Sequence, residues 1–295
     1  MKKFNGLTLI FSFLVLCAGN LLLYINDVTS GFVYVGILLF AFTFLSLLFI
    51  LLRSKGRKTK TISILTIAMA LLLLFEIKLL KLDSFTFVAS IPAKPIELLS
   101  GSGIHLMVVN TLDIQYVKDP ELVSMTFDKE QKQIIHLYKV NNQDRYQGKN
   151  MELLRLAGFQ NNEFQKTIKD VNRYLGKELH AIRSFSARTD LHGNSAGLGL
   201  ALTGLMGEDK LYNSQPFGVT GAITSTGAVK PIGMVKEKVI IADKYGLPRL
   251  IVPAENEQEA LDTKETLNLE IQIFSVHHID DAVQIIEEFN SDKEI

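Results

Sequence analysis

The sequence holds a single cysteine, Cys17, and no tryptophan. One thiol cannot build a disulfide framework or a thiolate metal cluster, so neither is expected. The 31 acidic and 31 basic side chains leave no net charge. A neutral chain has no general attraction to nucleic acid, and no nucleic-acid partner is expected. Function must therefore be sought in short local motifs.

Long uncharged apolar runs are concentrated in the first 80 residues. A helix of about 20 residues spans a hydrocarbon core of about 30 Å. Three runs approach this length, at about 6–25, 31–52 and 61–80, although Glu76 and Lys78 interrupt the third. We therefore expect residues 1–82 to form a membrane anchor with three transmembrane helices.

Basic side chains indicate how the anchor is oriented. Residues 53–60 carry five of them, whereas residues 26–30 carry none. The positive-inside rule places the N-terminus and the basic loop in the cytoplasm. The chain is then expected to be a multi-pass protein of the cell membrane, in contact with lipids, with the residues from 83 onward outside the cytoplasm. A cleaved signal peptide is the alternative for the first run, but no small-x-small cleavage site follows it.

The remaining chain has the pattern of a soluble domain. Residues 83–102 contain Pro92, Pro95 and Gly101 and are predicted to be a linker. Residues 103–295 are predicted to fold, beginning with one or two strands over 104–116 and a hairpin of strands 123–127 and 133–140. A polar loop at 141–150, a helical stretch at 151–156 and a helix over 163–175 are predicted to follow. The motif-bearing part, 178–290, alternates strands at 179–187, 217–224, 228–232, 249–252 and 269–274 with helices at 196–206, 235–245, 256–261 and 279–289. Such alternation indicates an α/β or α+β sheet covered by helices.

The stretch Gly193-Asn194-Ser195-Ala196-Gly197-Leu198-Gly199 lies between a predicted strand and a predicted helix. Small residues around one serine allow a sharp turn and close approach of a substrate. Backbone N–H groups at such a junction can also stabilise an oxyanion. A glycine-rich turn whose serine only caps the helix is the alternative interpretation.

A nucleophilic serine needs a base, and a desolvated lysine can serve. Residues 231–242 contain Lys236 and Lys238. On a helix, Lys238 shares a face with Val235, Ile241 and Ala242, whereas Lys236 lies on another face. Burial among apolar side chains lowers the pKa of a lysine toward neutrality. Lys238 is therefore the candidate base, unless its amine simply extends to solvent.

These residues together identify a family resemblance. Gly193-Asn194-Ser195-Ala196-Gly197 resembles the nucleophile motif of Lon-type proteases. The segments 218–224 and 227–233 look like the next two strands of that family, and 235–238 is similar to its lysine helix. The resemblance runs from about residue 193 to residue 288.

The resemblance implies roles for individual residues. Ser195 corresponds to the nucleophile, Lys238 to the base and Thr220 to a threonine beside this dyad. Gly193, Ala196 and Gly197 shape the turn at the serine, with a backbone N–H of Ala196 in the oxyanion hole. It also implies an α+β fold related to the second domain of ribosomal protein S5, preceded here by transmembrane helices, with protein or peptide substrates and a homo-oligomeric ring as the expected assembly.

Several features depart from the family pattern. Asn194 replaces the usual proline before the serine, and Met234 replaces the second glycine of the usual pair. No His-x-His precedes the nucleophile segment, and the sequence contains no ATP-binding Gly-x-x-x-x-Gly-Lys-Ser/Thr. We therefore expect a membrane-anchored Lon-like serine endopeptidase without an ATPase domain, whose Ser–Lys mechanism requires neither metal nor organic cofactor.

Three other functions fit part of the pattern. Gly-x-Ser-x-Gly also occurs in α/β-hydrolase esterases, which would require His277 or His278. Residues 193–199 could instead cradle a phosphate. A catalytically weak Lon-like binding or oligomerisation module is the non-enzymatic alternative.

Overall fold

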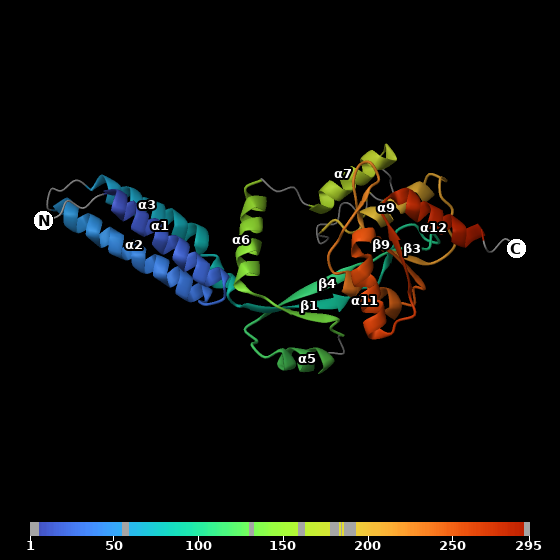
Figure 1. Cartoon of the computed structure of the whole chain (residues 1–295), viewed down its shortest axis with the longest axis horizontal. Coiled ribbons are helices and arrows are strands. Elements are labelled where there is room, and N and C mark those ends of the chain that lie inside the picture. The colour runs from blue at the N-terminus through green and yellow to red at the C-terminus, as the bar shows by residue number, and fades with distance from the viewer. Residues whose placement is uncertain are drawn as a thin grey trace. The chain divides into compact units, whose positions relative to one another are not determined.

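The computed structural model describes residues 6–54, 59–129, 133–158, 163–177, 183, 185 and 193–291. Contacts divide these residues between two units (Figure 1). The first comprises Met1–Val88, Asp113–Val123 and Leu137–Phe159, and the second comprises Ala89–Leu112, Ser124–His136 and Gln160–Ile295. The chain thus crosses repeatedly between units, which differs from the expected division into 1–82, a linker and 103–295.

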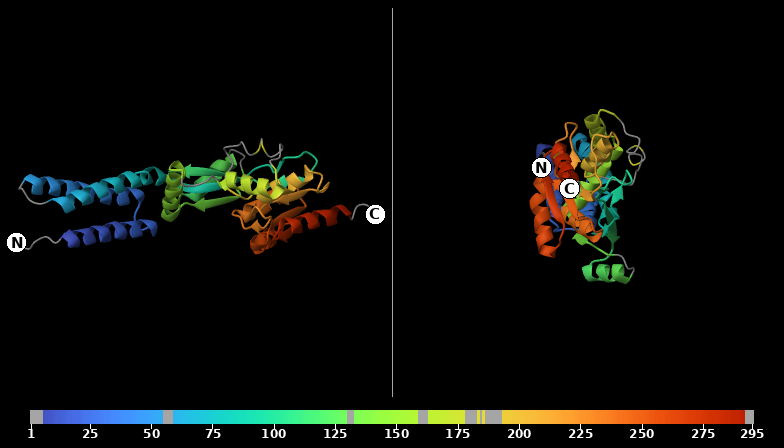
Figure 2. Two further views of the ribbon diagram at one scale, coloured as in Figure 1. Left: turned by 90° about the horizontal axis from the view of Figure 1, so that it is seen from above. Right: turned by 90° about the vertical axis from the view of Figure 1, so that its right-hand side faces the viewer.

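The apolar runs of the first unit are helical, as predicted. They form α1 (Gly6–Ile25), α2 (Gly31–Ser54), α3 (Lys60–Glu76) and α4 (Leu79–Leu82). Three stretches, Leu7–Ile25, Gly31–Ser54 and Lys60–Leu82, are long and apolar enough to cross a membrane. The three long helices run along one common direction in two views (Figures 1 and 2).

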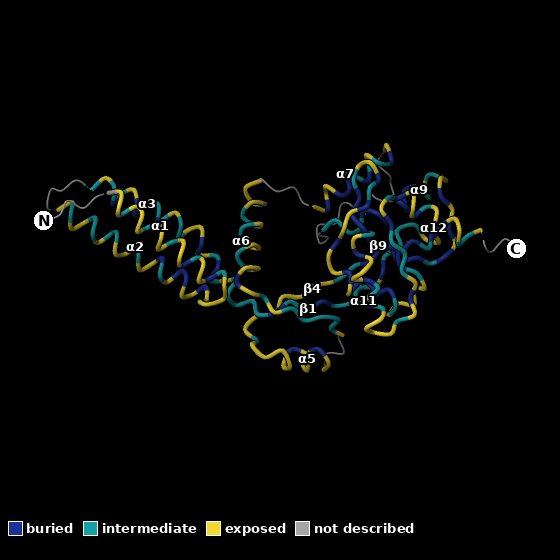
Figure 3. The backbone as a smooth tube through the Cα atoms, in the orientation of Figure 1, coloured by how far each residue is buried: buried dark blue, intermediate teal, exposed yellow. Residues whose placement is uncertain are grey.

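The outward faces of these helices are apolar. Exposed positions recur along α1, α2 and α3 (Figure 3) and include Phe11, Phe40 and Leu71, with exposed fractions of 68%, 73% and 63%. An apolar surface of this extent is unfavourable in water and favourable in hydrocarbon. The surface chemistry therefore agrees with membrane-embedded helices.

Helix α6 (Asn142–Leu156) contacts α1 and α4 within the first unit. The Asn142 side chain donates hydrogen bonds to the backbone carbonyls of Tyr24 (2.9 Å) and Thr29 (2.8 Å). About two turns of α6 further on, the Lys149 ammonium pairs with the Glu76 carboxylate, and both side chains are almost completely buried. The Lys149 nitrogen also lies 4.1 Å from the centre of the Phe75 ring.

Strands of the second unit form a mostly parallel sheet in the order β10-β9-β6-β3-β2. Neighbours among the first four strands pair in parallel, and β2 pairs antiparallel with β3. The strands are β2 (Ile96–Glu97), β3 (Ile104–Leu106), β6 (Phe217–Val219), β9 (Arg249–Pro253) and β10 (Gln272–Val276). A separate ribbon pairs β7 (Ala222–Ile223) with β8 (Val229–Lys230).

Helices cover both faces of this sheet. One core, containing Val219 and Ile251 of the sheet, includes side chains of α7 (Glu163–Leu175), α9 (Gly197–Met206) and α12 (Ile279–Ser291). The other core, containing Leu250 and Val252, includes side chains of α10 (Val235–Lys244) and α11 (Glu257–Leu267). Alternate residues of β9 thus point to opposite faces, as expected for a parallel strand buried on both sides.

The expected linker at 83–102 is wrong, because β1 (Phe85–Pro92) and β2 lie within it. Strand β1 is the central strand of a three-stranded sheet, β4-β1-β5, with β4 (Val109–Gln115) and β5 (His136–Lys139). Its sequence, Phe-Thr-Phe-Val-Ala-Ser-Ile-Pro, is rich in aromatic and β-branched residues. Pro92 is the last residue of β1, and a proline at that position does not interrupt the strand. Its presence therefore did not indicate a linker.

The predicted strand 123–127 is also wrong, because α5 (Pro120–Lys129) occupies it. Pro120 is the first helical residue, and Asp119 accepts a hydrogen bond from the Glu121 N–H at 2.9 Å, as a helix cap does. Val123 and Phe127, four residues apart, are both buried on one helical face.

The polar loop expected at 141–150 is helical in α6. The side-chain carbonyl of Asn141 accepts a hydrogen bond from the Asp144 N–H (2.8 Å), and the Asp144 carboxylate accepts one from the Asn141 N–H (3.3 Å). This reciprocal cap starts the helix despite its polar sequence. The strand expected at 179–187 lies outside the described residues except for two positions, Arg183 and Phe185, which are helical.

The buried pair of Glu76 and Lys149 generates a stability prediction. Glu76→Gln in the full-length chain should lower the free energy of unfolding by about 3–5 kcal/mol, because it leaves the Lys149 charge buried without a partner. The double variant Glu76→Gln/Lys149→Met should recover much of that loss. Unfolding of the chain in detergent micelles, followed by near-ultraviolet circular dichroism, measures both effects.

The matched control is the pair of Lys78 and Glu152, whose side chains are 26% and 41% exposed. Lys78→Met should cost less than about 1 kcal/mol, because solvent screens this pair. Equal losses for Glu76→Gln and Lys78→Met would contradict the assignment of the buried pair as the stronger constraint.

Candidate active site

Ser195 lies in a tight turn immediately before α9. Gly193 has a φ of +84°, which favours glycine. A Cβ at Gly197 would approach the Ile223 nitrogen to 3.0 Å, so a larger residue would push the turn off the β7 backbone. Ala196 occupies the position before the helix and supplies no capping side chain. The turn thus has physical reasons for its small residues, as predicted for Gly193 and Gly197.

Backbone bonds hold this turn against the end of β6. The Gly221 N–H donates to the Ser195 carbonyl (2.8 Å), and the Leu198 N–H donates to the Gly221 carbonyl (2.9 Å). The fully buried Thr220 adds a hydroxyl hydrogen bond to the same Ser195 carbonyl at 3.3 Å. The Thr220 hydroxyl therefore contacts the nucleophile segment through the main-chain carbonyl of Ser195.

Lys238 lies on the buried face of α10. Its exposed fraction is 4%, and Val235, Ile241 and Ala242 on the same face are completely buried. Lys236 is exposed. The prediction of which lysine faces the core is therefore confirmed. The Lys238 amine donates a hydrogen bond to the Gly233 carbonyl at 3.2 Å.

Burial lowers the pKa of Lys238 to about 8, and the carboxylates of Glu237 and Glu259 oppose that shift. A desolvated ammonium is disfavoured relative to the neutral amine, which explains the direction. Glu237 is itself buried, and His136 Nδ1 lies 3.4 Å from its Oε1. Neither acidic residue was predicted to influence the site. For Glu259 the reason is that no local pattern relates α11 to α10.

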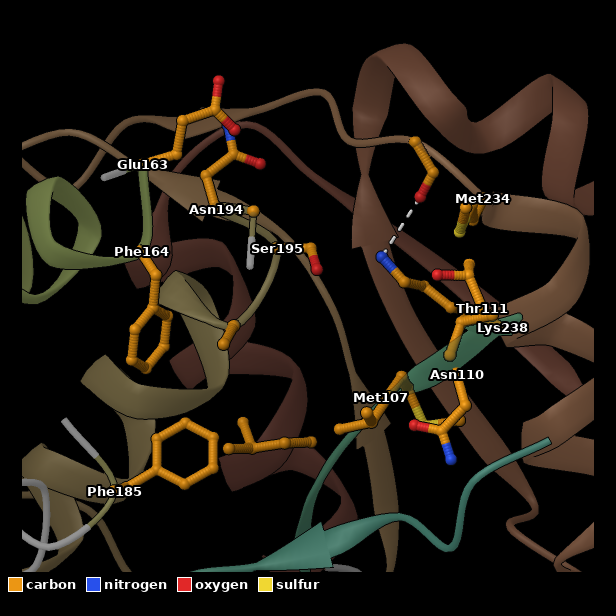
Figure 4. A pocket seen from close by; sticks show the side chains of 16 residues that line it. Met107, Asn110, Thr111, Glu163, Phe164, Phe185, Asn194, Ser195, Met234 and Lys238 are labelled. Carbon is orange, nitrogen blue, oxygen red and sulfur yellow. Dashed lines mark hydrogen bonds between the residues drawn. The ribbon is translucent and has the colours of Figure 1, made fainter. Parts of the chain in front are cut away.

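Ser195 and Lys238 line one pocket of about 480 Å³ (Figure 4). The Ser195 hydroxyl and the Lys238 amine both face this space, and the drawn hydrogen bond joins Lys238 to Gly233. Gly193 and Ala196 also line it. Gly197 and Thr220 lie behind the turn and support it instead.

The rest of the pocket wall comes from distant parts of the sequence. Residues 106–111, from the last residue of β3 to the start of β4, form one side, and Phe164 and Phe185 form an apolar side. Glu163, at the start of α7, and Asn194 lie at the same end of the pocket. The sequence analysis predicted a helix over 163–175 but could not show that Phe164 of this helix, or residues 106–111, lie in the pocket of Ser195.

The two histidines of the esterase alternative lie elsewhere. Neither His277 nor His278 lines the pocket of Ser195. A ring nitrogen of His278 instead lies 2.9 Å from the Thr226 carbonyl, and the other lies 3.1 Å from Asp280. The described geometry thus gives Ser195 a lysine neighbour in its pocket and no histidine from this pair.

Comparison with known proteins finds similarity within the second unit. Residues 160–288 match the family model of the Lon protease (S16) C-terminal proteolytic domain. The chain is 33% identical over 120 residues to a Lon protease of Anaeromyxobacter dehalogenans (strain 2CP-C), a match covering 36% of this chain and 14% of that protein. It is 40% identical over 91 residues to the peroxisomal Lon protease homolog 2 of Caenorhabditis elegans, covering 31% and 12%.

A Lon protease of Bacillus thuringiensis (strain Al Hakam) is 31% identical over 123 residues, covering 38% of this chain and 16% of that relative. The chain therefore spans only about a seventh of the length of these relatives. The match includes the turn of Ser195, the strands β6 and β9 and the lysine helix α10. Residues 160–288 of this chain are thus similar to the C-terminal proteolytic domain of Lon proteases.

Proposed function

We propose that this chain is a membrane-anchored serine endopeptidase that hydrolyses peptide bonds of protein substrates with a Ser195–Lys238 dyad. The carrying observation is a buried lysine, with its pKa lowered to about 8 by burial, in the same pocket as a serine at a small-residue turn. The relatives named above are Lon proteases, which supports peptide hydrolysis as the reaction. No ATP-binding Gly-x-x-x-x-Gly-Lys-Ser/Thr lies within these 295 residues, so the proposed activity does not use an ATPase segment of this sequence.

In the proposed mechanism the neutral Lys238 amine accepts the proton of the Ser195 hydroxyl. One amine N–H remains donated to the Gly233 carbonyl, which orients the nitrogen and leaves its lone pair for this proton. The Ser195 oxygen attacks the peptide carbonyl carbon, and backbone N–H groups at Ser195 and Ala196 stabilise the oxyanion. Lys238 then returns the proton to the leaving amine, and water hydrolyses the acyl-enzyme.

Thr220 acts as a support in this mechanism. Its hydroxyl and the Gly221 N–H both donate hydrogen bonds to the Ser195 carbonyl, which fixes the turn at the end of β6. A fixed carbonyl restricts rotation of the serine backbone and so holds the hydroxyl toward the pocket. We further propose a homo-oligomeric assembly, in line with the family resemblance.

The dyad predicts a non-additive loss of activity. Ser195→Ala, Lys238→Ala and the double variant should fall to one common residual rate of peptide hydrolysis, because either loss disables the unit. Lys238→Arg should be equally inactive, since an arginine stays protonated and cannot accept the proton. Hydrolysis of an unfolded protein by the full-length chain in detergent micelles measures these rates.

Lys236→Ala is the matched control, because this exposed lysine lies on the other face of α10, and it should retain most of the rate. His277→Ala and His278→Ala should also remain active. Full activity of Ser195→Ala would end the peptidase proposal. Loss of activity only in His277→Ala or His278→Ala would favour the esterase alternative.

The base predicts the pH dependence. Below pH about 8 the rate should rise about tenfold per pH unit, because only the deprotonated fraction of Lys238 can act, and it should level off above that value. The pH–rate profile of kcat/KM from pH 5.5 to 9.5 checks this. An apparent pKa near 6.5, or a rate that falls as the pH increases from 6 to 8, would exclude Lys238 as the base.

We also propose that the proteolytic unit lies outside the cytoplasm, in a multi-pass protein of the cell membrane. Five basic residues within 53–60, where α2 ends and α3 begins, against none between α1 and α2, support this orientation. An alkaline phosphatase fused after Ile295 should be active, whereas the same reporter fused after Ser54 should be inactive. The reverse pattern would place the proteolytic unit in the cytoplasm.

A further inference from the structure

Met234 has a backbone conformation that a methionine rarely adopts. Its φ and ψ are 59° and 40°, in the left-handed region, immediately before the first residue of α10. A side chain here brings Cβ close to the backbone, so glycine is favoured and asparagine is tolerated. The preceding Gly233 does not have a left-handed φ, and a Cβ at Gly233 would meet nothing within 4 Å. In this turn Met234, which has a side chain, therefore adopts the strained conformation, whereas Gly233 adopts an unstrained one.

Both Gly233 and Met234 line the active-site pocket, and Met234 contributes a side chain to it. Met234 lines the pocket with Ser195 and Lys238, and its exposed fraction is 38%. In Figure 4 it lies on the Lys238 side of Ser195, whereas Phe164 and Phe185 lie on the other side. The pocket therefore has different walls on the two sides of Ser195, one made by buried aromatic rings and one by a thioether.

We propose that Met234 is a specificity-determining residue, which restricts the substrate side chain on the Lys238 side of the scissile bond to small or unbranched ones. This inference rests on the proposed peptidase function. A methionine side chain has three rotatable bonds and adapts to slender apolar groups. It nevertheless occupies volume beside the base, so an aromatic ring of the substrate would collide with it. Selection on the Phe164 and Phe185 side is independent of this residue.

The backbone and the side chain of Met234 can be tested separately. Met234→Ala removes the thioether but keeps a Cβ at the left-handed position, whereas Met234→Gly removes both. Met234→Asn tolerates the left-handed conformation with a short polar group, and Met234→Leu keeps the apolar volume. Substrate selection should follow side-chain volume, and stability should follow backbone tolerance.

The experiment uses the full-length chain in detergent micelles and peptide libraries that vary one residue on each side of the cleaved bond. For each peptide position we compare kcat/KM for an aromatic residue with kcat/KM for alanine. Met234→Ala and Met234→Gly should both increase this ratio about tenfold, at only one of the two varied positions. Met234→Leu should retain the selection of the unaltered protein. Met234→Gly, but not Met234→Ala, should raise the midpoint of thermal unfolding by about 2–4 °C.

Two failures are distinguishable. If the unaltered chain neither cleaves peptides nor is labelled at Ser195 by a fluorophosphonate, the proposed peptidase is wrong and this inference ends with it. If the unaltered chain cleaves peptides, and Met234→Ala and Met234→Gly have the same cleavage profile as the unaltered chain, Met234 does not determine specificity. A change of equal size on both sides of the scissile bond would likewise overturn the inference, because it would indicate a general loosening of the site.

Discussion

Removal of the Lys238 amine from water is the constraint on which the proposed chemistry depends. An ammonium in bulk water stays protonated near neutral pH and has no lone pair to offer. The apolar layer formed by Val235, Val239 and Ile241 excludes water from one side of α10. The acidic side chains of Glu237 and Glu259 limit the shift, which leaves the pKa of the amine at about 8. A base of this strength is a compromise between being deprotonated and being able to hold a proton.

The sheet explains how a serine and a lysine from opposite layers come to share a pocket. Helix α9 packs into the core on one face of the sheet and α10 into the core on the other. Their residues can therefore meet only beyond the ends of the strands. Residues 107–111 follow β3, and Thr220 and Gly221 follow β6, so the pocket lies at the carboxyl ends of parallel strands. Ligand sites of open parallel sheets occur at this edge for the same reason.

Local patterns predicted what a helix or turn determines by itself. The spacing of residues 235, 238, 241 and 242 placed one lysine in the core and the other in solvent, and the structure agrees. Patterns failed where capping outweighed composition, as at Asp119 before α5 and at Asn141 and Asp144 before α6. They also could not place residues 106–111 or Phe164 beside Ser195, because that proximity arises from strand order. The sequence showed that Met234 departs from the family pattern, but the left-handed backbone and the position in the pocket required coordinates.

The crossing of the chain between two units has a consequence for the order in which the protein is made. Asn142 supplies hydrogen bonds to the turn between α1 and α2, and it lies 118 residues after Tyr24. At synthesis rates of about 5–20 residues per second, the hairpin waits on the order of ten seconds for this partner. During that interval the Thr29 carbonyl must be hydrated or bound by other molecules, whereas the Tyr24 carbonyl also accepts from the Asp27 N–H (3.0 Å) of the hairpin itself. The ribosome, and not the diffusion of chain segments, therefore sets how long the nascent membrane hairpin remains incomplete.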